Sequence, residues 1–449
     1  MALIRPFRGL RPIGEYASEV LAPPYDVLSS VEAKALAAGK PWSFLHISKP
    51  EIDLPDATDP YSDSVYRKAA KNFGLMLTAG ILKRDPAPYY YVYRMREDDH
   101  VQTGLVAVAS VQAYRNNRIR RHENTLPKKE RDRINQIEAL NAQTGPVLMA
   151  YRDDDTLERL LNSESEKRPE MRVTTDAAVE HSLWVVSDKK KIATLTAAFD
   201  EMPALYIADG HHRSAAAATI ANKRGGTGDS AACFFLSVLF PQSALRILDY
   251  NRIVKDLGGR SADNLRASIA SNYRIKAITD AVRPSAKGMF TMYLDHQWYQ
   301  LDLRRALKRM EAPAAELDPK ILTETILQPL LGIKDLRTDP RIEFVGGRRG
   351  LGELERRVDS GEMAVAFSLL PTSMSQLVAV ADAGHAQQLL GRGRGDEARP
   401  ARRRDQAHAH GAALARHLLA SHSTHNMRPL PENFCGPPRP RNERMNGCP

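Results

Sequence analysis

Apolar and polar residues alternate along this chain in two different periods, which predicts a mixture of strands and helices. Residues 89–94 and 103–114 alternate with period two around a polar turn, as expected for a hairpin. Residues 231–240 form a continuous apolar run typical of a buried strand. Residues 61–79 carry their apolar side chains at helical spacing. The same patterns predict a strand at 146–151 and helices at 31–38, 127–142, 156–161, 189–199 and 214–224.

The two ends of the patterned region differ from its middle. Four prolines interrupt residues 1–30, which are therefore predicted to be extended and rich in turns. From Arg246 onward the pattern predicts a helix at 261–271, a hairpin at 288–303 and a basic helix at 304–310. We therefore predict an α+β fold with a first region at 1–245, a C-terminal α+β region at 246–384 and an atypical tail at 385–449.

Composition is that of a globular enzyme, with 43% hydrophobic and 26% charged residues among 449. No apolar run approaches the ~20 residues of a membrane span, and the N-terminus lacks the pattern of a signal peptide. We therefore expect a cytoplasmic protein with no membrane partner. The three cysteines have no disulfide or zinc spacing, and Cys233, inside an apolar run, is predicted to be a core residue.

The net charge of +10 is concentrated in the tail, where 11 Arg, 5 acidic residues and no Lys occur between His385 and Pro449. This segment also lacks Ile, Val, Tyr and Trp, so we expect it to be largely disordered. An Arg-rich ending without Lys is also what a translational frameshift or an error in the gene boundary would produce. Without the tail the charge falls to +4 and no helix-turn-helix pattern is found, so a nucleic-acid partner is not expected.

The strongest chemical signal lies at residues 205–217, where an apolar strand is followed by Asp209-Gly210 and a helix that opens on His211, His212 and Arg213. Free backbone N–H groups at a helix start, the helix dipole and a forked guanidinium can converge on one phosphate-sized anion. The Asp209 carboxylate is placed to bind a magnesium ion that bridges phosphate oxygens. The alternative is an Asp-Gly turn whose His and Arg side chains are merely solvated.

The pentad Asp209-Gly-His-His-Arg resembles the phosphate-binding box of the ParB/sulfiredoxin superfamily, and in this form it is similar to that of the free L-serine kinases. Three further segments, Arg5-Pro-Phe-Arg-Gly, Ala22-Pro-Pro-Tyr-Asp-Val and Val380-Ala-Asp-Ala-Gly, resemble the bacterial domain of unknown function 1015 family, roughly over residues 1–384. Residues 361–372 resemble a late segment of the serine kinases. The family pattern continues with a Pro-Lys-Ser-Thr-Trp-like ending, from which this chain departs at His385.

The resemblance implies a ParB/sulfiredoxin-like core elaborated by N- and C-terminal α+β segments. It also implies a magnesium-dependent kinase that converts free L-serine to O-phosphoserine with ATP, ADP or pyrophosphate as phosphoryl donor. The alternative is a nucleotide-dependent binding or regulatory protein of the ParB type without kinase activity.

Phosphorylating a hydroxyl also requires a base near its proton. Serine kinases of this type use a Glu upstream of the pentad, and by resemblance Glu123 is the candidate, with His122 as a second catalytic group beside His212. Thr125, two residues beyond Glu123, is a candidate substrate contact. The alternative is a capping segment in which Thr125 or its neighbour starts the following helix.

Four other residues are candidates for contacts with the substrate. Tyr25 and Asp26 stand in a Pro-rich turn, Arg11 is a candidate anion contact, and Arg133 belongs to an Asp-Arg pair that fits the family pattern. A structural turn for Tyr25 and Asp26, and a solvated helix face for Arg133, remain the alternatives.

Overall fold

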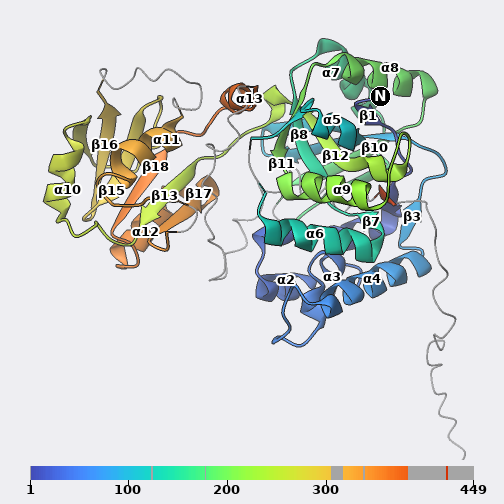
Figure 1. The fold of residues 1–449 in the computed structure, drawn as a ribbon, viewed down its shortest axis with the longest axis horizontal. Helices are drawn as coiled ribbons and strands as arrows, with labels where there is room; N and C mark the ends of the chain where they lie inside the picture. Colours follow the sequence, from blue (N-terminus) through green and yellow to red (C-terminus); the bar gives the residue numbers. More distant parts are fainter. Residues whose placement is uncertain are drawn as a thin grey trace, which may run out of the picture.

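The computed structural model describes residues 2–122, 125–176, 178–304, 317–336 and 339–382, together with the backbone of Ser421–His422. The described residues form two lobes, each built on its own β-sheet (Figure 1). Helices and antiparallel strands are mixed in both lobes, so the predicted α+β class is confirmed. No described helix has the length and apolar character needed to cross a bilayer.

The larger lobe contains a nine-stranded sheet in the order β6-β11-β8-β12-β5-β4-β10-β9, with β1 paired to β5. Most neighbours are antiparallel, but β12 runs parallel to β8, and β11 runs parallel to β6. The strands are β1 Ile4–Arg5, β4 Tyr90–Glu97, β5 His100–Ser110, β6 Ile119–Arg120, β8 Val147–Tyr151, β9 Met171–Thr174, β10 Glu180–Val186, β11 Leu205–Asp209 and β12 Phe234–Pro241.

Apolar side chains cover both faces of this sheet, as their alternation predicts. One face, which includes Tyr90 and Val92, packs against helices α7, α8 and α9; the other includes Tyr91, Tyr93 and the buried Cys233. The core position of Cys233 is thus confirmed. The helices of this lobe are α1 Ala17–Val20, α2 Ser30–Ala37, α3 Leu45–Ser48, α4 Asp63–Thr78, α5 Val111–Arg115, α6 Pro127–Leu140, α7 Asp155–Ser165, α8 Lys189–Glu201 and α9 His211–Lys223.

Helices α2, α3 and α4 form a separate layer beneath α6, which lies between them and α9 (Figure 1). Ile134 of α6 packs against Ala216 and Ile220 of α9. On its other side, Gln136 of α6 donates a hydrogen bond to the Ile47 carbonyl of α3 at 2.8 Å. Helix α6 therefore links the N-terminal helical layer to the helix that follows the pentad.

The smaller lobe carries a six-stranded sheet in the order β14-β16-β15-β18-β13-β17, and the chain passes to it between Pro241 and Tyr250. The predicted hairpin at 288–303 is present as β15 and β16. The predicted basic helix at 304–310 lies almost wholly outside the described residues. The elements are β13 Tyr250–Val254, α10 Ala262–Ile269, β14 Tyr273–Ile278, β15 Met289–Leu294, β16 Gln297–Leu303, α11 Asp318–Leu322, β17 Ile342–Gly346, α12 Gly350–Asp359 and β18 Val365–Leu369.

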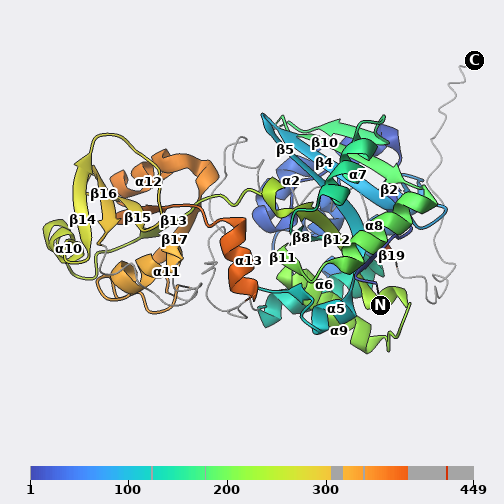
Figure 2. The ribbon, with the colours of Figure 1, turned by 90° about the horizontal axis from the view of Figure 1, so that it is seen from above.

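The last described helix, α13 Met374–Asp382, returns to the larger lobe (Figure 2). Met374, Leu377 and Val378 pack against Tyr206 of β11, and Asp382 forms ion pairs with Arg120 and Arg152. Sequence analysis placed these residues in the C-terminal region. Their contacts instead support the strand that leads into the pentad.

Two short strand pairs complete the described fold. Leu10–Pro12 (β2) pairs with Leu82–Arg84 (β3), and Ser421–His422 (β19) pairs with Ala142–Gln143 (β7). The second pair brings one point of the tail's backbone to the segment that follows α6.

Some boundaries differ from the sequence predictions for local reasons. The strand predicted to run to residue 114 ends at Ser110, because the Ser110 hydroxyl accepts a hydrogen bond from the N–H of Ala113 and caps α5. His46 lies in α3, where its Nδ1 is 2.8 Å from an Asp53 carboxylate oxygen. The sequence did not predict strand β10, because the buried polar residues His181 and Ser182 interrupt its apolar pattern.

Candidate functional site

The pentad forms a sharp turn from strand β11 into helix α9, as its residues predict. Gly210 is the N-cap of α9 and has φ of 100°, in the left-handed region. A Cβ at this position would lie 3.1 Å from Cζ of Arg213 and 3.2 Å from Cα of Val147. Glycine is therefore required here both by the backbone conformation and by the close approach of its neighbours.

Arg213 lies at the base of this turn and is only 8% exposed. Its guanidinium donates hydrogen bonds to the Pro146 carbonyl and to the Asp209 carboxylate. A carboxylate oxygen of Asp26 lies 3.8 Å from the same terminal nitrogen that binds Asp209. The structure thus brings three predicted site residues, Asp26, Asp209 and Arg213, into one ionic cluster.

The histidines connect α9 to the segment before α6. His212 Nε2 accepts a hydrogen bond from the Leu126 N–H at 3.0 Å, so the starts of α9 and α6 are adjacent. The rings of His122 and His211 are both buried and meet edge to face with centroids 4.4 Å apart. His122 is therefore adjacent to the pentad, and its catalytic role stays a prediction.

The other residues of this segment are only partly described. Thr125 donates a hydrogen bond from its hydroxyl to Glu130 of the first turn of α6 at 3.0 Å. Glu123, the predicted base, lies outside the described residues. Its role remains a prediction.

Arg133 is the second cation at the site. It donates from Nε and one terminal nitrogen to Asp132, and its Cζ lies 4.2 Å from the centre of the Tyr25 ring. Burial alone would lower the pKa of Arg133, but Tyr25 and Asp132 together raise the pKa above its ordinary value. The guanidinium is therefore charged at every accessible pH.

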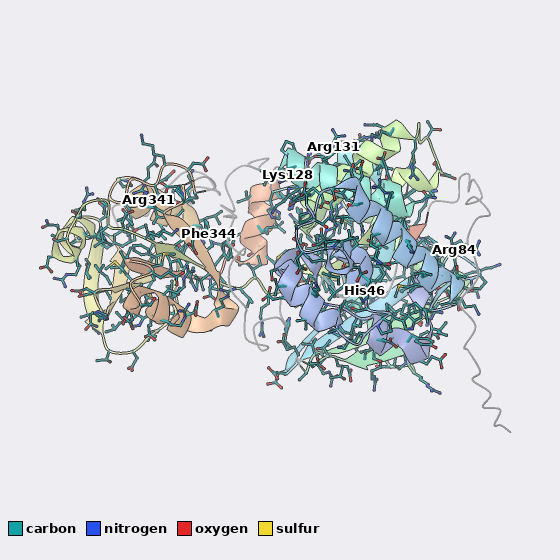
Figure 3. The ribbon with its side chains drawn as sticks, turned by 90° about the horizontal axis from the view of Figure 1, so that it is seen from below. His46, Arg84, Lys128, Arg131, Arg341 and Phe344 are labelled. Atoms are coloured by element: carbon teal, nitrogen blue, oxygen red, sulfur yellow. The ribbon has the colours of Figure 1, made fainter. Side chains whose placement is uncertain are left out.

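Arg133 and Arg213 both line one small cleft. Tyr25, Ser48, Arg133, Gln136, Thr144 and Arg213 are among its lining residues, and its enclosed volume is about 30 Å³. Two predicted substrate contacts, Tyr25 and Arg133, therefore line the same cleft as Arg213, which is predicted to bind the phosphate. Figure 3 shows the lobe that holds this cleft, with Lys128 and Arg131 of α6 and His46 of α3 labelled.

Arg11 occupies a different environment. Its guanidinium forks onto Asp85, with nitrogen–oxygen distances of 2.9 to 3.2 Å, and also contacts Glu170. Burial would lower the pKa of Arg11, but the hydrogen bond and charge of Asp85 raise the pKa above its ordinary value. Because Arg11 is not among the residues that line the cleft, the structure does not bring it together with the other candidates.

The two carboxylates that contact Arg213 fit a magnesium ion that is held jointly with a bound phosphate. Among the described residues no group of three or more His, Cys, Asp or Glu could hold a metal by itself. Magnesium, however, usually binds one or two carboxylates and completes its shell with phosphate oxygens and water. Asp209 and Asp26, which contact the same nitrogen of Arg213, are suitably placed to supply them.

Four other residues that line the cleft gave no signal of a site in the sequence. Ser48 comes from the end of α3, Gln136 from α6, and Gln143 and Thr144 from the segment after α6. The side chain of Gln143 bridges the backbone of Phe234 and Leu236 in β12. Nothing in the apolar sequence around Ser48 indicated a site.

The fold and cleft define an α+β protein in which a glycine turn joins a strand to a helix beside a small cleft. The chain belongs to the family described as "Protein of unknown function (DUF1015)", whose pattern matches residues 4–320. This confirms the family resemblance inferred from the sequence. The search of curated proteins found no match.

Solved structures give only distant similarities. SbnI with a C-terminal truncation, from Staphylococcus aureus, matches with a TM-score of 0.32 and 12% identity over 65% of this chain and 80% of that one. A free serine kinase mutant in complex with ADP matches with a TM-score of 0.30 and 11% identity over 64% and 87%. A free serine kinase in complex with AMP matches with a TM-score of 0.29 and 10% identity over 62% and 82%. These similarities are too weak to assign a function.

Proposed function

We propose that this protein is a cytoplasmic small-molecule kinase that transfers a phosphoryl group to the hydroxyl of free L-serine and releases O-phosphoserine. The observation that carries the proposal is the buried Arg213, held at a helix start beside the carboxylates of Asp209 and Asp26. A forked guanidinium next to backbone N–H groups binds a phosphoryl group well. Besides the Pro146 carbonyl, its partners are the carboxylates of Asp209 and Asp26, anions that a phosphate can replace.

The transfer would proceed in one step. The serine oxygen forms a bond to the phosphorus while the bond from that phosphorus to the bridging oxygen of the donor breaks. The serine proton passes to Glu123, and the donor leaves with its bridging oxygen. Arg213, His212 and the N–H groups of Gly210 and His211 stabilise the charge on the transferred group. His122, whose ring contacts that of His211, is assigned as a second catalytic group.

Magnesium, bound through Asp209, would neutralise charge on the donor. ATP, ADP and pyrophosphate share the terminal phosphoryl group that this site recognises, so all three are candidate donors. Arg133 and Tyr25 are assigned to the acceptor because they line the same cleft as Arg213. Thr125 is assigned to the substrate from its place beside Glu130 at the start of α6.

The test is an assay of the purified chain with L-serine, magnesium and each donor in turn, with O-phosphoserine detected by mass spectrometry. Arg213→Lys is the test variant, and Arg159→Lys, on the exposed face of α7, is the control. O-phosphoserine formed by the parent and the control but not by Arg213→Lys supports the proposal. Nucleotide binding without any product would instead favour the ParB-like binding protein.

A further inference from the structure

The cleft that Arg213 lines also contains a buried hydroxyl that makes no hydrogen bond within the described residues. Ser48 is 9% exposed, and its Oγ has no hydrogen-bond partner among the described residues. A serine inside a helix usually bonds the carbonyl one turn earlier, as Thr78 bonds Gly74 in α4. A buried hydroxyl without a partner costs free energy, so its presence at the wall of a cleft indicates a partner supplied by a ligand.

The structure holds this hydroxyl close to a charged group. Gln136 fixes the Ile47 carbonyl, which immediately precedes Ser48, and Arg133 lies one turn before Gln136 on α6. Two nitrogens of Arg133 bind the same oxygen of Asp132, while its remaining terminal nitrogen makes no hydrogen bond within the described residues. One hydroxyl donor and one guanidinium nitrogen therefore stand unused in the same cleft.

The size of the cleft limits what these donors can bind. An enclosed volume of about 30 Å³ holds roughly two water molecules. It is far below the ~300 Å³ of a pocket that buries a drug-sized ligand. A carboxylate group matches both the volume and the two donors, whereas a nucleoside does not.

We infer that Ser48 and Arg133 form a subsite for the α-carboxylate of the amino-acid acceptor. Ser48 donates its hydroxyl hydrogen to one carboxylate oxygen, and Arg133 donates an N–H to the carboxylate while the Tyr25 ring covers its guanidinium. The acceptor's hydroxyl group is then directed toward Arg213, which lines the same cleft. This inference rests on the proposed function for its substrate class, and it makes the site selective for a free amino acid.

The experiment measures binding without phosphoryl transfer, by calorimetric titration with L-serine and with L-serine amide, which lacks the carboxylate charge. The parent protein should bind L-serine more tightly than the amide. Ser48→Ala should weaken L-serine binding about tenfold or more, because a hydrogen bond to a charged group is lost. The same variant should weaken binding of the amide by less, because a hydrogen bond to the uncharged amide oxygen is weaker than one to a carboxylate.

Two controls separate a binding role from a structural one. Ser43→Ala removes a buried hydroxyl outside the cleft, one that accepts a hydrogen bond from Leu45, and should leave L-serine binding unchanged. Ser48→Ala should not lower the melting temperature, since it removes an unsatisfied polar group and keeps the packing. Arg133→Lys keeps the charge but should lose the selectivity for L-serine over its amide.

The outcomes keep the two hypotheses apart. L-serine binding that depends on Ser48, in a protein that forms no O-phosphoserine with any donor, would support the subsite and contradict the kinase. Serine phosphorylation with unchanged affinity in Ser48→Ala would support the kinase and overturn the subsite. A parent protein that binds neither L-serine nor O-phosphoserine would also overturn the subsite.

Discussion

The side chain of Arg213 is buried, and its neighbours hold it in one orientation. The guanidinium is 8% exposed, and its hydrogen bonds to Pro146 and Asp209 fix its orientation. Removing one partner of a buried ion pair leaves the other charge uncompensated, which is costlier than losing a surface pair. Substitutions at this position should therefore affect stability as well as the proposed phosphoryl transfer, and the conservative one is the more informative.

Arg213→Lys should lower the rate of O-phosphoserine formation roughly 10²–10³-fold, because a point charge replaces the forked contact to the transferred phosphoryl group. Steady-state kinetics with the preferred donor measures this. The melting temperature of the variant shows whether the fold has survived. A folded variant with the parent's rate would exclude Arg213 from the transfer step.

Asp209→Asn tests the role in magnesium binding. The substitution keeps the shape of the side chain and removes the negative charge that magnesium prefers. The magnesium concentration needed for half-maximal rate should rise about tenfold. An unchanged magnesium dependence would show that the ion, if used, is held elsewhere.

His46 makes the stability of the N-terminal helical layer depend on pH. The hydrogen bond and charge of Asp53 raise the pKa of His46, while the same pair lowers the pKa of Asp53 although burial opposes this. The pair therefore stabilises the protein most below the unfolded pKa of His46, ~6.5, and above that of Asp53, ~3.9. The His46 contribution is lost as pH rises through its folded pKa.

His46→Gln should consequently destabilise the protein by about 1 kcal/mol near pH ~5.5 and by less near pH ~9. Thermal unfolding of the parent and the variant at both pH values measures the difference. Equal destabilisation at the two values would mean that His46 acts by packing rather than by charge.

At the scale of elements, the turn between β11 and α9 depends on one backbone conformation. Gly210→Ala would put a methyl group 3.1 to 3.2 Å from Arg213 and Val147 and would strain a residue at φ of 100°. The same substitution at Gly225, with φ of 57° and nothing within 4 Å, imposes strain without the contact. Gly225, which follows α9, is therefore a matched control.

Gly225→Ala should cost ~1–2 kcal/mol of stability and leave the activity unchanged. Gly210→Ala should cost more than that and should also reduce the rate, because Arg213 must move away from the added methyl group. Chemical denaturation and the serine assay compare the two. If the two substitutions changed stability and rate equally, the close contact made by a methyl group at position 210 would have no effect of its own.

The elements around the pentad could be predicted because their signals are local. An apolar strand, an Asp-Gly turn and a helical pattern lie next to one another in the sequence, and β11 and α9 follow them. The pairing of Tyr25 with Arg133 and the place of Ser48 depend on packing between segments far apart in the chain. No periodicity in the sequence reports such packing.

At the scale of the whole molecule, helix α13 connects the end of the smaller lobe to the edge of the larger sheet (Figure 2). It covers Tyr206 of β11 and pairs Asp382 with Arg120 and Arg152. Strand β11 ends at Asp209, the first residue of the pentad. Helix α13 therefore supports the strand that carries the candidate site. The tail beyond it contributes one described strand pair, β19 with β7.

Two truncations separate the helix from the tail. Ending the chain at residue 384 should change the melting temperature little, since the composition of residues 385–449 predicts a largely disordered segment and its described pairing spans two residues. Ending it at residue 373 should lower the free energy of unfolding by ~3–6 kcal/mol, because Met374, Leu377 and Val378 no longer bury apolar surface. This truncation should also lower the rate of serine phosphorylation.

Limited proteolysis of the full chain should accordingly cut first between residues 385 and 405. A protease-resistant tail, or a 384-residue chain as unstable as the 373-residue one, would show that residues 385–449 fold onto the larger lobe and belong to the working structure.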